Sequence, residues 1–492
     1  MLITKWLLGA CAAFCASMAI AETDHVLLTS KSGELTIQGP VLDFDGRHIS
    51  ISSEYGPVVL DMGNFSCVGA ACPDAEIKTE TLILTAPQSV LDVLMPALIE
   101  NFALRRARQI DRAQQDDDTV FILAPLSDPN RTLSIDLRPM DPDFAIEALI
   151  AHETDAAVSF RPLTSDETAT MLARHPASLG SPSSLVLAYD AIAPVIAPPS
   201  ATQSVNITDL VTAIASDDSI FDVTNQVAMY FAHHGTTTKP PIAHADLVQS
   251  LYADPTRSGV VPFSNLGGLQ VLDILTPCGA FPLVNKRTVK SGDYPFNAPI
   301  FIHTSPYRLG AQAQEFLDYV TSPAAQMVIQ RAGFVDQMME EIPITAQGKR
   351  LAIAIAQADA TTLPQLQSLL KTLDQGNRLT ITFRPPDATG SLDPVSMSHI
   401  KMLADAIKTD RFKGRAMYFV GFNFDAPDQT RNIERSQQQA ADVLQALLTK
   451  IKTSDGQLNS MVSMGFGSIL PNTCDGSAIG NRVNNRVEVW IK

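Results

Sequence analysis

Three histidines come closest to a pattern that could do chemistry. His233 and His234 are adjacent and His244 follows downstream, so a metal site is the first hypothesis. Successive side chains of an extended segment point to opposite sides, which keeps adjacent histidines from sharing one ion. No thiolate or carboxylate accompanies them at the spacing of a metal motif. We therefore expect no metal, and roles for these histidines in a loop or at a helix end.

Signatures of enzymes are also missing from the sequence. It contains no nucleophile elbow, no paired-carboxylate pattern and no metal-ligand motif. We expect a non-enzymatic protein without a cofactor.

The N-terminus has the order of a secretory signal. One positive residue, Lys5, precedes an apolar run that ends in Ala19-Ile20-Ala21, a small-x-small cleavage site. We expect residues 1–21 to be removed and the protein to be exported to the periplasm. The alternative is a lipoprotein signal that ends at Cys11.

Four cysteines follow the signal, and an even number in an exported chain favours disulfides. Cys67 and Cys72 are close enough to close a small loop, which leaves Cys278 and Cys474 for each other. The alternative for the second pair is two buried free thiols.

Charge is unevenly distributed along the chain. The formal net charge is −16, of which residues 22–377 carry −20 and residues 378–492 carry +3. A strongly acidic field argues against a nucleic-acid partner. It does not exclude a small anion, because backbone dipoles can hold one inside an acidic protein.

Apolar periodicity then divides the exported chain. Short alternating runs separated by glycine turns predict a small β meander in residues 22–76. Strands and helices alternate over residues 77–337, which predicts an α/β domain with a mostly parallel sheet. Residues 338–376 are rich in Ala, Gln and Leu, which predicts one or two connector helices.

Residues 377–492 predict a βαβαβ unit. Its last strand alternates Val487, Val489 and Ile491 with Glu488, Trp490 and Lys492, so we expect one buried face.

Residues 77–337 resemble, in the order of their pieces, the phosphate-type periplasmic binding proteins of the PstS class. The matching segments are residues 155–163, 185–195, 206–214, 259–266 and a closing helix over 310–333. The resemblance implies a two-lobed, type II periplasmic-binding-protein-like domain in which three turns converge on phosphate or another small oxyanion. Those turns contain Gln88, Ser89, Ser159, Arg161, His234, Gly235, Thr236 and Thr237. His234 replaces the family's serine, and Tyr230 falls where the family has an arginine.

Residues 421–425, 432–443 and 464–492 resemble the C-terminal domain of the OmpA family, which binds peptidoglycan. The resemblance implies a wall-binding site made by Asp425, Asn432, Arg435 and Arg486. The sequence departs from the family pattern, because Phe424 and Gln439 fall where the family has its aspartate and arginine.

Together these expectations describe a non-enzymatic envelope protein that binds a small solute and is tethered to peptidoglycan, near the outer membrane or cell wall. Its further partner would be an envelope or transporter protein. The alternative is a structural adaptor whose receptor-like domain binds a protein and no small ligand.

Overall fold

The structure is a computed structural model, which describes most of the chain in several ranges. The described residues are 25–30, 33, 35–44, 48–54, 56–62, 65–72, 79–129, 131–174, 182–216, 221–277, 279–280, 283–305, 309–384, 392–451, 460–474 and 476–492. The predicted signal peptide and Cys11 lie outside them. The chain divides into two compact units, residues 1–77 and 78–492, and each is described by itself.

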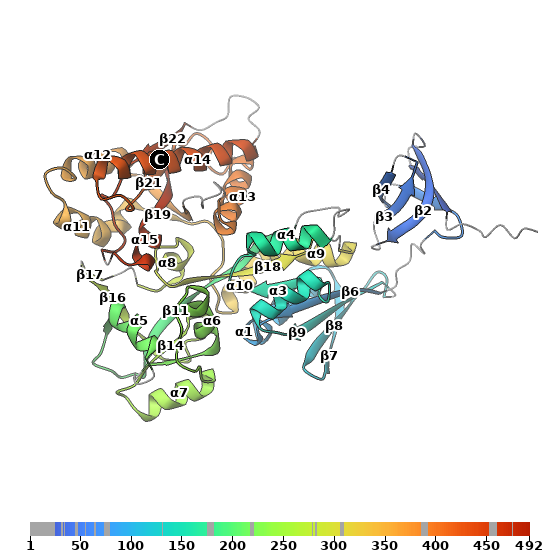
Figure 1. The fold of residues 1–492 in the computed structure, drawn as a ribbon, viewed down its shortest axis with the longest axis horizontal. Coiled ribbons are helices and arrows are strands. Elements are labelled where there is room, and N and C mark those ends of the chain that lie inside the picture. The colour runs from blue at the N-terminus through green and yellow to red at the C-terminus, as the bar shows by residue number, and fades with distance from the viewer. Residues whose placement is uncertain are drawn as a thin grey trace, which may run out of the picture. The chain divides into compact units, whose positions relative to one another are not determined.

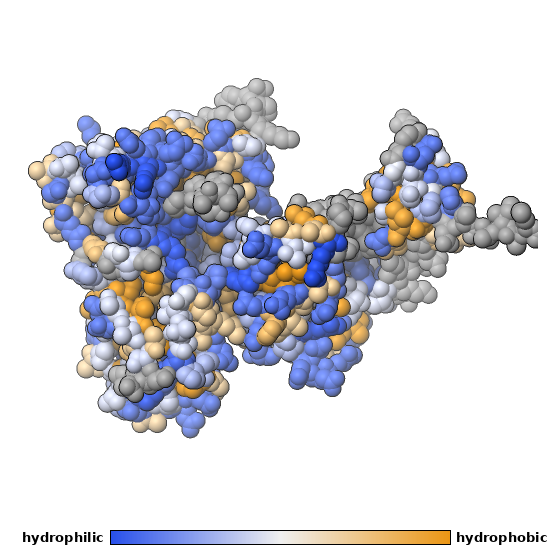
Figure 2. All heavy atoms as spheres, in the orientation of Figure 1, coloured by the Kyte–Doolittle hydropathy of each residue, from blue (hydrophilic) through white to orange (hydrophobic). Residues whose placement is uncertain are grey.

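The first unit contains a five-stranded antiparallel sheet in the order β4-β3-β2-β1-β5 (Figure 1). Its strands are β1 (His25–Ser30), β2 (Thr36–Phe44), β3 (His48–Ser53), β4 (Gly56–Asp61) and β5 (Phe65–Val68). A disulfide joins Cys67 to Cys72. The predicted meander and this predicted disulfide are confirmed. The core of the sheet is small, and hydrophobic residues show on its surface in Figure 2.

The second unit is organised around a ten-stranded sheet whose main order is β13-β14-β11-β18-β10-β6-β9-β8-β7, with β15 paired to β11. The strands are β6 (Thr79–Ala86), β7 (Arg108–Gln115), β8 (Asp118–Pro125), β9 (Thr132–Pro139), β10 (Ala156–Ser159), β11 (Ser183–Ile196), β13 (Phe221–Val223), β14 (Ser258–Pro262), β15 (Gln270–Val271) and β18 (Asn297–Thr304). A separate small sheet joins β12 (Ser204–Asn206), β16 (Asp273–Thr276) and β17 (Gly279–Ala280).

The prediction of a mostly parallel sheet is wrong. β6 runs parallel to β9 and β10, and β13 runs parallel to β14. However, β18 returns from late in the chain and lies antiparallel between β10 and β11. β7 and β8 add an antiparallel hairpin at the edge. The polar β7 strand lacks the alternating apolar pattern that identifies strands in the sequence.

Two hydrophobic cores give the domain its lobes. Lobe 1 gathers side chains of β6, β8, β9 and β10 with those of α2, α9 and α10. Lobe 2 gathers side chains of β13 and β14 with those of α5 and α6. β11 contributes to both cores, so it passes from one lobe to the other. The helices here are α1 (Gln88–Leu91), α2 (Leu94–Arg105), α3 (Pro142–Ala151), α4 (Ser165–Arg174), α5 (Ile207–Ala215), α6 (Asn225–His233), α7 (His244–Ala253), η1 (Phe263–Asn265), α8 (Lys286–Lys290), α9 (Ala311–Val320) and α10 (Pro323–Arg331).

The closing helix predicted over residues 310–333 is two helices, α9 and α10. Ser322 caps α10 by accepting a hydrogen bond from the Ala325 amide, and Pro323 stands at the first helical position. Proline lacks the amide hydrogen that a continuous helix needs, so the break is a local effect of this pair.

The C-terminal region is a five-stranded sheet in the order β19-β20-β23-β21-β22, with helices on both faces (Figure 1). Its elements are β19 (Glu341–Pro343), η2 (Ile344–Gln347), α11 (Gly348–Gln357), α12 (Leu363–Leu373), β20 (Asn377–Phe383), α13 (Pro394–Lys408), β21 (Met417–Phe422), α14 (Gln429–Ile451), β22 (Met461–Gly465), α15 (Ala478–Asn484) and β23 (Arg486–Ile491). The expected connector helices and the expected alternation of strands and helices are present.

The prediction that β23 has one buried face is wrong, because all of its residues are buried. Val487, Val489 and Ile491 pack in a core with α13 and α14. Trp490 packs on the opposite face with α11 and α12. The connector helices therefore cover the face that the alternation predicted to be open to solvent.

Within the described ranges, no helix combines the length and the apolar character that crossing a membrane requires.

Candidate functional site

A cleft of about 840 Å³ lies between the two lobes. Its walls come from α1 and the start of α3 on one side, and from the starts of α6 and α7 with η1 on the other. The residues that line it are Pro87, Gln88, Ser89, Asp92, Val93, Pro139, Met140, Asp141, Phe160, Thr224, Asn225, Gln226, Met229, Ile242, Ala243, His244, Pro262, Ser264, Asn265, Ala332 and Phe334. A crevice between two rigid halves is a common place for a small ligand.

Three helices of nine or ten residues begin at this cleft: α3, α6 and α7. Their N-cap residues, Asp141, Thr224 and Ala243, all line the cleft, and none makes a side-chain capping bond within the described ranges. The first amides of a helix have no acceptor inside it and carry a partial positive charge. The cleft therefore receives backbone donors from three directions, which suits an oxyanion.

Two side-chain atoms at the cleft are buried without a partner. Thr224 Oγ1 and His244 Nδ1 have no hydrogen bond among the described residues. The threonine is 5% exposed, and a buried polar atom left unpaired costs about 1–3 kcal/mol. Burial also lowers the pKa of His244, so the ring is neutral at pH 7. Both atoms are available to a bound solute.

A buried carboxylate fixes the lobe 2 side of the cleft. Asp190 accepts hydrogen bonds from the Ser264 amide (2.9 Å), the Ser264 hydroxyl (2.6 Å) and Gln226 Nε2 (3.2 Å). Burial raises the pKa of Asp190 to about 6, against the opposing effect of these donors. Because Ser264 and Gln226 both line the cleft, Asp190 holds two of its polar side chains in place.

The charge of the cleft is unusual for an anion site. Asp92 and Asp141 line it and are exposed, whereas the described lining includes no lysine or arginine. Such a site combines neutral donors with carboxylate acceptors. It can bind a solute that accepts several hydrogen bonds and also donates a proton.

The predicted ligand residues separate into two groups. Gln88 and Ser89 line the cleft, and Gln88 Nε2 donates to Asp92 over 2.7 Å. The other predicted residues are not part of the lining. The expected convergence of three turns is therefore corrected. Of the predicted residues, only those of one turn, Gln88 and Ser89, line the cleft.

Ser159 and Arg161 flank Phe160 in the sequence, and Phe160 lines the cleft whereas the other two do not. The Ser159 hydroxyl donates to the Arg161 carbonyl oxygen (2.5 Å) and lies 2.8 Å from His303 Nε2. The Arg161 guanidinium pairs with Glu167 and Asp143. Neighbours in an extended segment face opposite sides. Phe160 therefore faces the cleft, and the predicted residues Ser159 and Arg161 do not.

His234, Gly235, Thr236 and Thr237 follow the C-terminal end of α6, at the end of the helix opposite the cleft. Gly235 adopts a left-handed conformation (φ +74°), and the Thr236 amide donates to the Phe231 carbonyl (2.9 Å). Glycine in this conformation ends a helix. The turn therefore lies at the carbonyl end of the helix dipole, which disfavours an anion.

The predicted wall-binding residues are also divided. Asp425 is exposed, and its carboxylate accepts from Asn485 Nδ2 (2.6 Å) and Asn423 Nδ2 (3.3 Å). Arg435 is exposed on α14, whereas Asn432 is buried and bonds both the amide and the carbonyl of Ala426 (2.9 Å each). Asn432 thus holds the loop before α14.

Arg486 lies inside the molecule. Its side chain is fully buried, pairs with Glu488 (2.8 Å), and donates to the carbonyls of Asn484 (2.8 Å) and Leu470 (2.9 Å). Its guanidinium also stacks over Phe422 at 4.5 Å. The expectation that Arg486 contacts a wall peptide is corrected, because every side of this group is occupied by the protein.

Two further sequence expectations concern metals and cysteines. Among the described residues, no group of three or more His, Cys, Asp and Glu side chains could hold a metal ion. Cys474 is disulfide-bonded, but its predicted partner Cys278 lies outside the described residues, so that pairing stays a prediction.

Sequence reasoning missed Thr224, Gln226 and Ser264, and it considered His244 for a metal site and not for this cleft. Thr224 follows the short strand β13 and precedes an apolar helical pattern, which is the signature of a helix N-cap. That signal could have placed the start of α6, and hence the donors, ten residues before the predicted turn.

The chain matches no protein-family model, and no curated protein matches it. Solved structures similar to it include a protein described as a possible phosphate-binding protein from Planctomyces limnophilus, at 15% identity over 57% of this chain and 99% of that one, with a TM-score of 0.37. An ABC-type phosphate transport receptor from Vibrio cholerae is 12% identical over 52% of this chain and 99% of that one, with a TM-score of 0.38. PstS from Borrelia burgdorferi is 15% identical over 52% and 98%, with a TM-score of 0.35. Because these TM-scores lie below 0.5, the proposals below rest on the residues of this chain.

Proposed function

We propose that this chain is an exported, non-enzymatic solute-binding protein whose cleft holds a small oxyanion. The observation that carries the proposal is the convergence of three uncapped helix N-termini on one cleft that also contains the unpartnered Thr224 Oγ1 and His244 Nδ1. A dehydrated oxyanion needs many donors at close range, and helix amides with hydroxyl and imidazole groups supply them without a full positive charge.

The carboxylates of the cleft favour an oxyanion that still carries a proton. Asp92 and Asp141 can accept a hydrogen bond from the hydroxyl of a protonated phosphate, whereas they repel sulfate, which has no such proton at neutral pH. A carboxylate that accepts a hydrogen bond from the ligand offsets part of the like-charge repulsion, whereas a ligand without a proton meets the repulsion alone. We propose phosphate as the ligand class and expect sulfate to be excluded from the cleft.

Calorimetric titration of the exported chain, residues 22–492, tests this proposal. Phosphate should bind with an affinity that falls about tenfold in Thr224→Val, because a valine keeps the shape of the side chain and removes one hydrogen bond of about 1.4 kcal/mol. Thr237→Val is the matched control, since it makes the same change at an exposed threonine outside the cleft.

Phosphate binding that is equal in both variants would place the ligand elsewhere. Binding of neither phosphate nor any other small anion would favour the alternative, an adaptor that contacts an envelope or transporter protein without a small ligand.

Export to the periplasm is the second part of the proposal. It is supported by the signal-like residues 1–21 and by the Cys67–Cys72 disulfide, since disulfides persist in oxidising compartments. Cell fractionation with N-terminal sequencing should find the protein in the periplasm beginning at Glu22. A cytoplasmic chain that retains Met1 would contradict it.

A tether to peptidoglycan is the second candidate function. The observation that favours it is the exposed Asp425, whose carboxylate is oriented by Asn485 and Asn423, with the exposed Arg435 on the helix that follows. A carboxylate and a guanidinium can hold the ammonium and carboxylate of a zwitterionic peptide end. Resemblance to the OmpA family motivates the same assignment.

Sedimentation with purified sacculi tests the tether. Asp425→Ala and Arg435→Ala should each lower retention, whereas Asp442→Ala, an exposed aspartate on α14, should not. Retention that is the same in all three variants would remove these residues from the site, and a wild-type chain that is not retained would remove the tether.

A further inference from the structure

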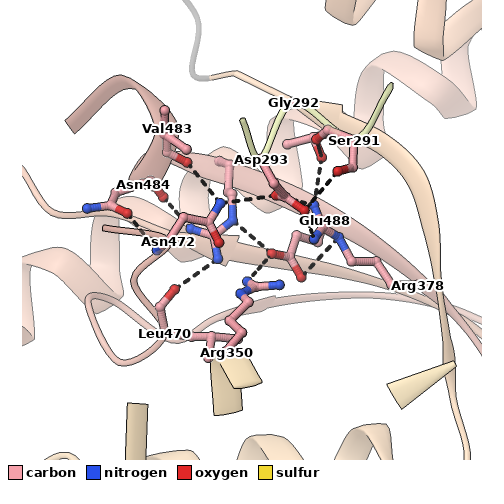
Figure 3. A network of polar contacts seen from close by, with 12 residues as sticks. Ser291, Gly292, Asp293, Arg350, Arg378, Leu470, Asn472, Val483, Asn484 and Glu488 are labelled. Carbon is pink, nitrogen blue, oxygen red and sulfur yellow. Dashed lines mark hydrogen bonds and ion pairs between the residues drawn. The ribbon is translucent and has the colours of Figure 1, made fainter. Parts of the chain in front are cut away.

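A cluster of buried charges joins lobe 2 to the C-terminal region (Figure 3). Arg378 of β20 forms two hydrogen bonds with Asp293, which follows α8, over 2.7 and 2.9 Å. Glu488 of β23 pairs with Arg350 of α11 and, over 2.8 Å, with Arg486. Arg378 and Glu488 are themselves close, with 3.5 Å between Nε and Oε2. Five charged groups from four segments of the chain thus share one buried volume.

The charges of this cluster do not cancel. Three guanidinium groups face two carboxylates, which leaves one positive charge in excess. The surrounding arginines lower the pKa of Glu488 despite its burial. Burial and then the charge of Arg350 lower the pKa of Arg486 to about 9. The lowered pKa of Glu488 is the response expected of a carboxylate in a positive field, whereas the lowered pKa of Arg486 reflects burial first and that field second.

A cavity of about 220 Å³ opens beside this cluster. Its lining contains three cations, Arg287 of α8 and Lys349 and Arg350 of α11. Arg287 and Lys349 are exposed at its mouth, while the Arg350 side chain is only 12% exposed. Asp293 also lines the cavity, but its carboxylate is occupied by Arg378 and by Asn472 Nδ2 (3.0 Å).

Two buried atoms of the cavity residues are unsatisfied. Arg350 Nε and Asn472 Oδ1 have no hydrogen-bond partner in the described part of the chain. The first is a charged donor, whose lost hydrogen bond is among the costlier ones to leave unmade. The cavity also lies beside the point where η2 passes into α11, since Ala346, Gln347 and Lys349 line it.

We propose that this junction cavity is a second anion site, which binds a small oxyanion between Arg287, Lys349 and Arg350. The oxyanion accepts from Arg350 Nε and neutralises the excess charge of the cluster. It contacts lobe 2 through α8 and the connector through α11, beside the 471–472 segment of the C-terminal region. Binding there strengthens the docking of the C-terminal region on lobe 2. This site is independent of the cleft and differs from it in chemistry, because full positive charges hold its ligand.

Sulfate is the probe that separates the two sites. The junction cavity accepts any compact oxyanion by charge, whereas the cleft is expected to exclude sulfate because Asp92 and Asp141 need a proton donor. Sulfate at low millimolar concentration, with chloride used to keep the ionic strength constant, should bind the wild-type chain in a calorimetric titration and raise its melting temperature. Low concentration avoids the general stabilisation that sulfate gives to proteins.

The double variant Arg287→Ala/Lys349→Ala should bind sulfate at least tenfold more weakly. Both residues lie at the exposed mouth, so the buried cluster remains complete. The matched control is Lys286→Ala/Lys371→Ala, which removes two exposed positive charges outside the cavity. Thr224→Val should leave sulfate binding unchanged. Both double variants are first unfolded with denaturant in the absence of sulfate. If the mouth variant unfolds at a lower denaturant concentration than its control, the sulfate titration is repeated with the single variant Lys349→Gln.

Three results would overturn the junction site. They are a wild-type chain that does not bind sulfate, a mouth variant that binds it as well as the control, and sulfate binding that weakens in Thr224→Val. The last would place sulfate in the cleft. Phosphate binding that is lost in Thr224→Val and kept in the mouth variant would support the proposed cleft function. It would also show that the junction cavity binds no phosphate. The two proposals can therefore fail separately.

Discussion

The inter-lobe cleft and the paired centre of the junction cluster, Arg378, Asp293 and Glu488, treat polar groups in opposite ways. At the cleft, Thr224 and His244 offer neutral atoms with no partner among the described residues, and three helices present uncapped starts. At the junction, Arg378, Asp293 and Glu488 are buried and paired with one another. Buried polar groups are usually satisfied, so pairing marks a structural role and its absence marks a place for a ligand.

This difference matters for residues chosen by type. Arg486 and Arg161 attract attention in the sequence because arginines bind anions and carboxylates. In the structure both are occupied by carboxylates and carbonyls of the protein. Thr224 and His244 have side-chain atoms without a partner among the described residues, so they remain free to bind a solute. The partners of a residue, which its sequence position does not reveal, decide between the two roles.

The largest expected effect is at the junction. Arg378→Met should lower the free energy of unfolding by about 3–5 kcal/mol, because it leaves Asp293 and Glu488 buried with fewer partners. Urea unfolding measures this loss. Lys413→Met, which removes an exposed ion pair with Asp410, should cost less than about 0.5 kcal/mol. Similar losses in the two variants would contradict the structural role of the cluster.

A second expected effect compares two histidines. Both nitrogens of buried His303 are bonded, to Ser159 (2.8 Å) and Ser184 (2.9 Å), whereas Nδ1 of His244 has no partner among the described residues. Burial lowers the pKa of His303 to about 4. The unfolded chain therefore takes up this proton from about pH 6.5, whereas the native chain resists it until about pH 4. Stability from this group is present at pH 7 and is lost as pH falls through that window.

The difference in unfolding free energy between wild type and His303→Gln should therefore shrink by up to about 3 kcal/mol from pH 7 to pH 4. Asp190 acts in the opposite direction, because its raised pKa favours the native state at low pH. Its contribution is the same in both chains and cancels in the difference. Urea unfolding at several pH values checks this, and a difference independent of pH would refute it.

Thr224→Val comes next in size. Without ligand, its unfolding free energy should match or slightly exceed that of wild type, because the change removes an unpaired buried hydroxyl. With phosphate, about 1.4 kcal/mol of binding energy should disappear. The variant thus loses binding without losing stability, the reverse of Arg378→Met. A variant that loses stability in the absence of ligand would show that the hydroxyl has a structural partner.

The smallest effect concerns Arg161. Arg161→Ala removes the pairs with Glu167 and Asp143, which lie outside the cleft. Phosphate affinity should stay within about twofold of wild type in a calorimetric titration, which is less than about 0.4 kcal/mol. A tenfold loss would restore the assignment made from the resemblance and would mean that Arg161 turns toward the ligand on binding.

Much of the fold could be predicted from periodicity. The N-terminal meander, the connector helices and the alternation after residue 377 all follow from local patterns of apolar residues. The antiparallel return of β18 could not be predicted, because it joins β10 and β11 across a long sequence separation. The burial of Glu488 depends on α11 and α12, which cover a strand face from more than a hundred residues away in the sequence.

The candidate site was less predictable than the fold. Gln88 and Ser89 lie in the turn after β6, which the strand pattern and the turn residues that follow it predict, and both line the cleft. The resemblance predicts ligand donors in the turn at Gly235, whereas glycine after an apolar helical pattern signals the end of a helix. The resemblance therefore places the expected donors after the C-terminal end of α6, whereas the free amides lie at its N-terminal end, one helix length away.

The most direct test of the cleft proposal is a crystal structure of the exported chain grown with phosphate. We predict a tetrahedral anion between the lobes, within hydrogen-bonding distance of Thr224 Oγ1 and of the first amides of α6. A phosphate bound beside His234 and Thr236 would contradict the cleft proposal. So would a structure in which the two lobes close on a cleft that holds no phosphate.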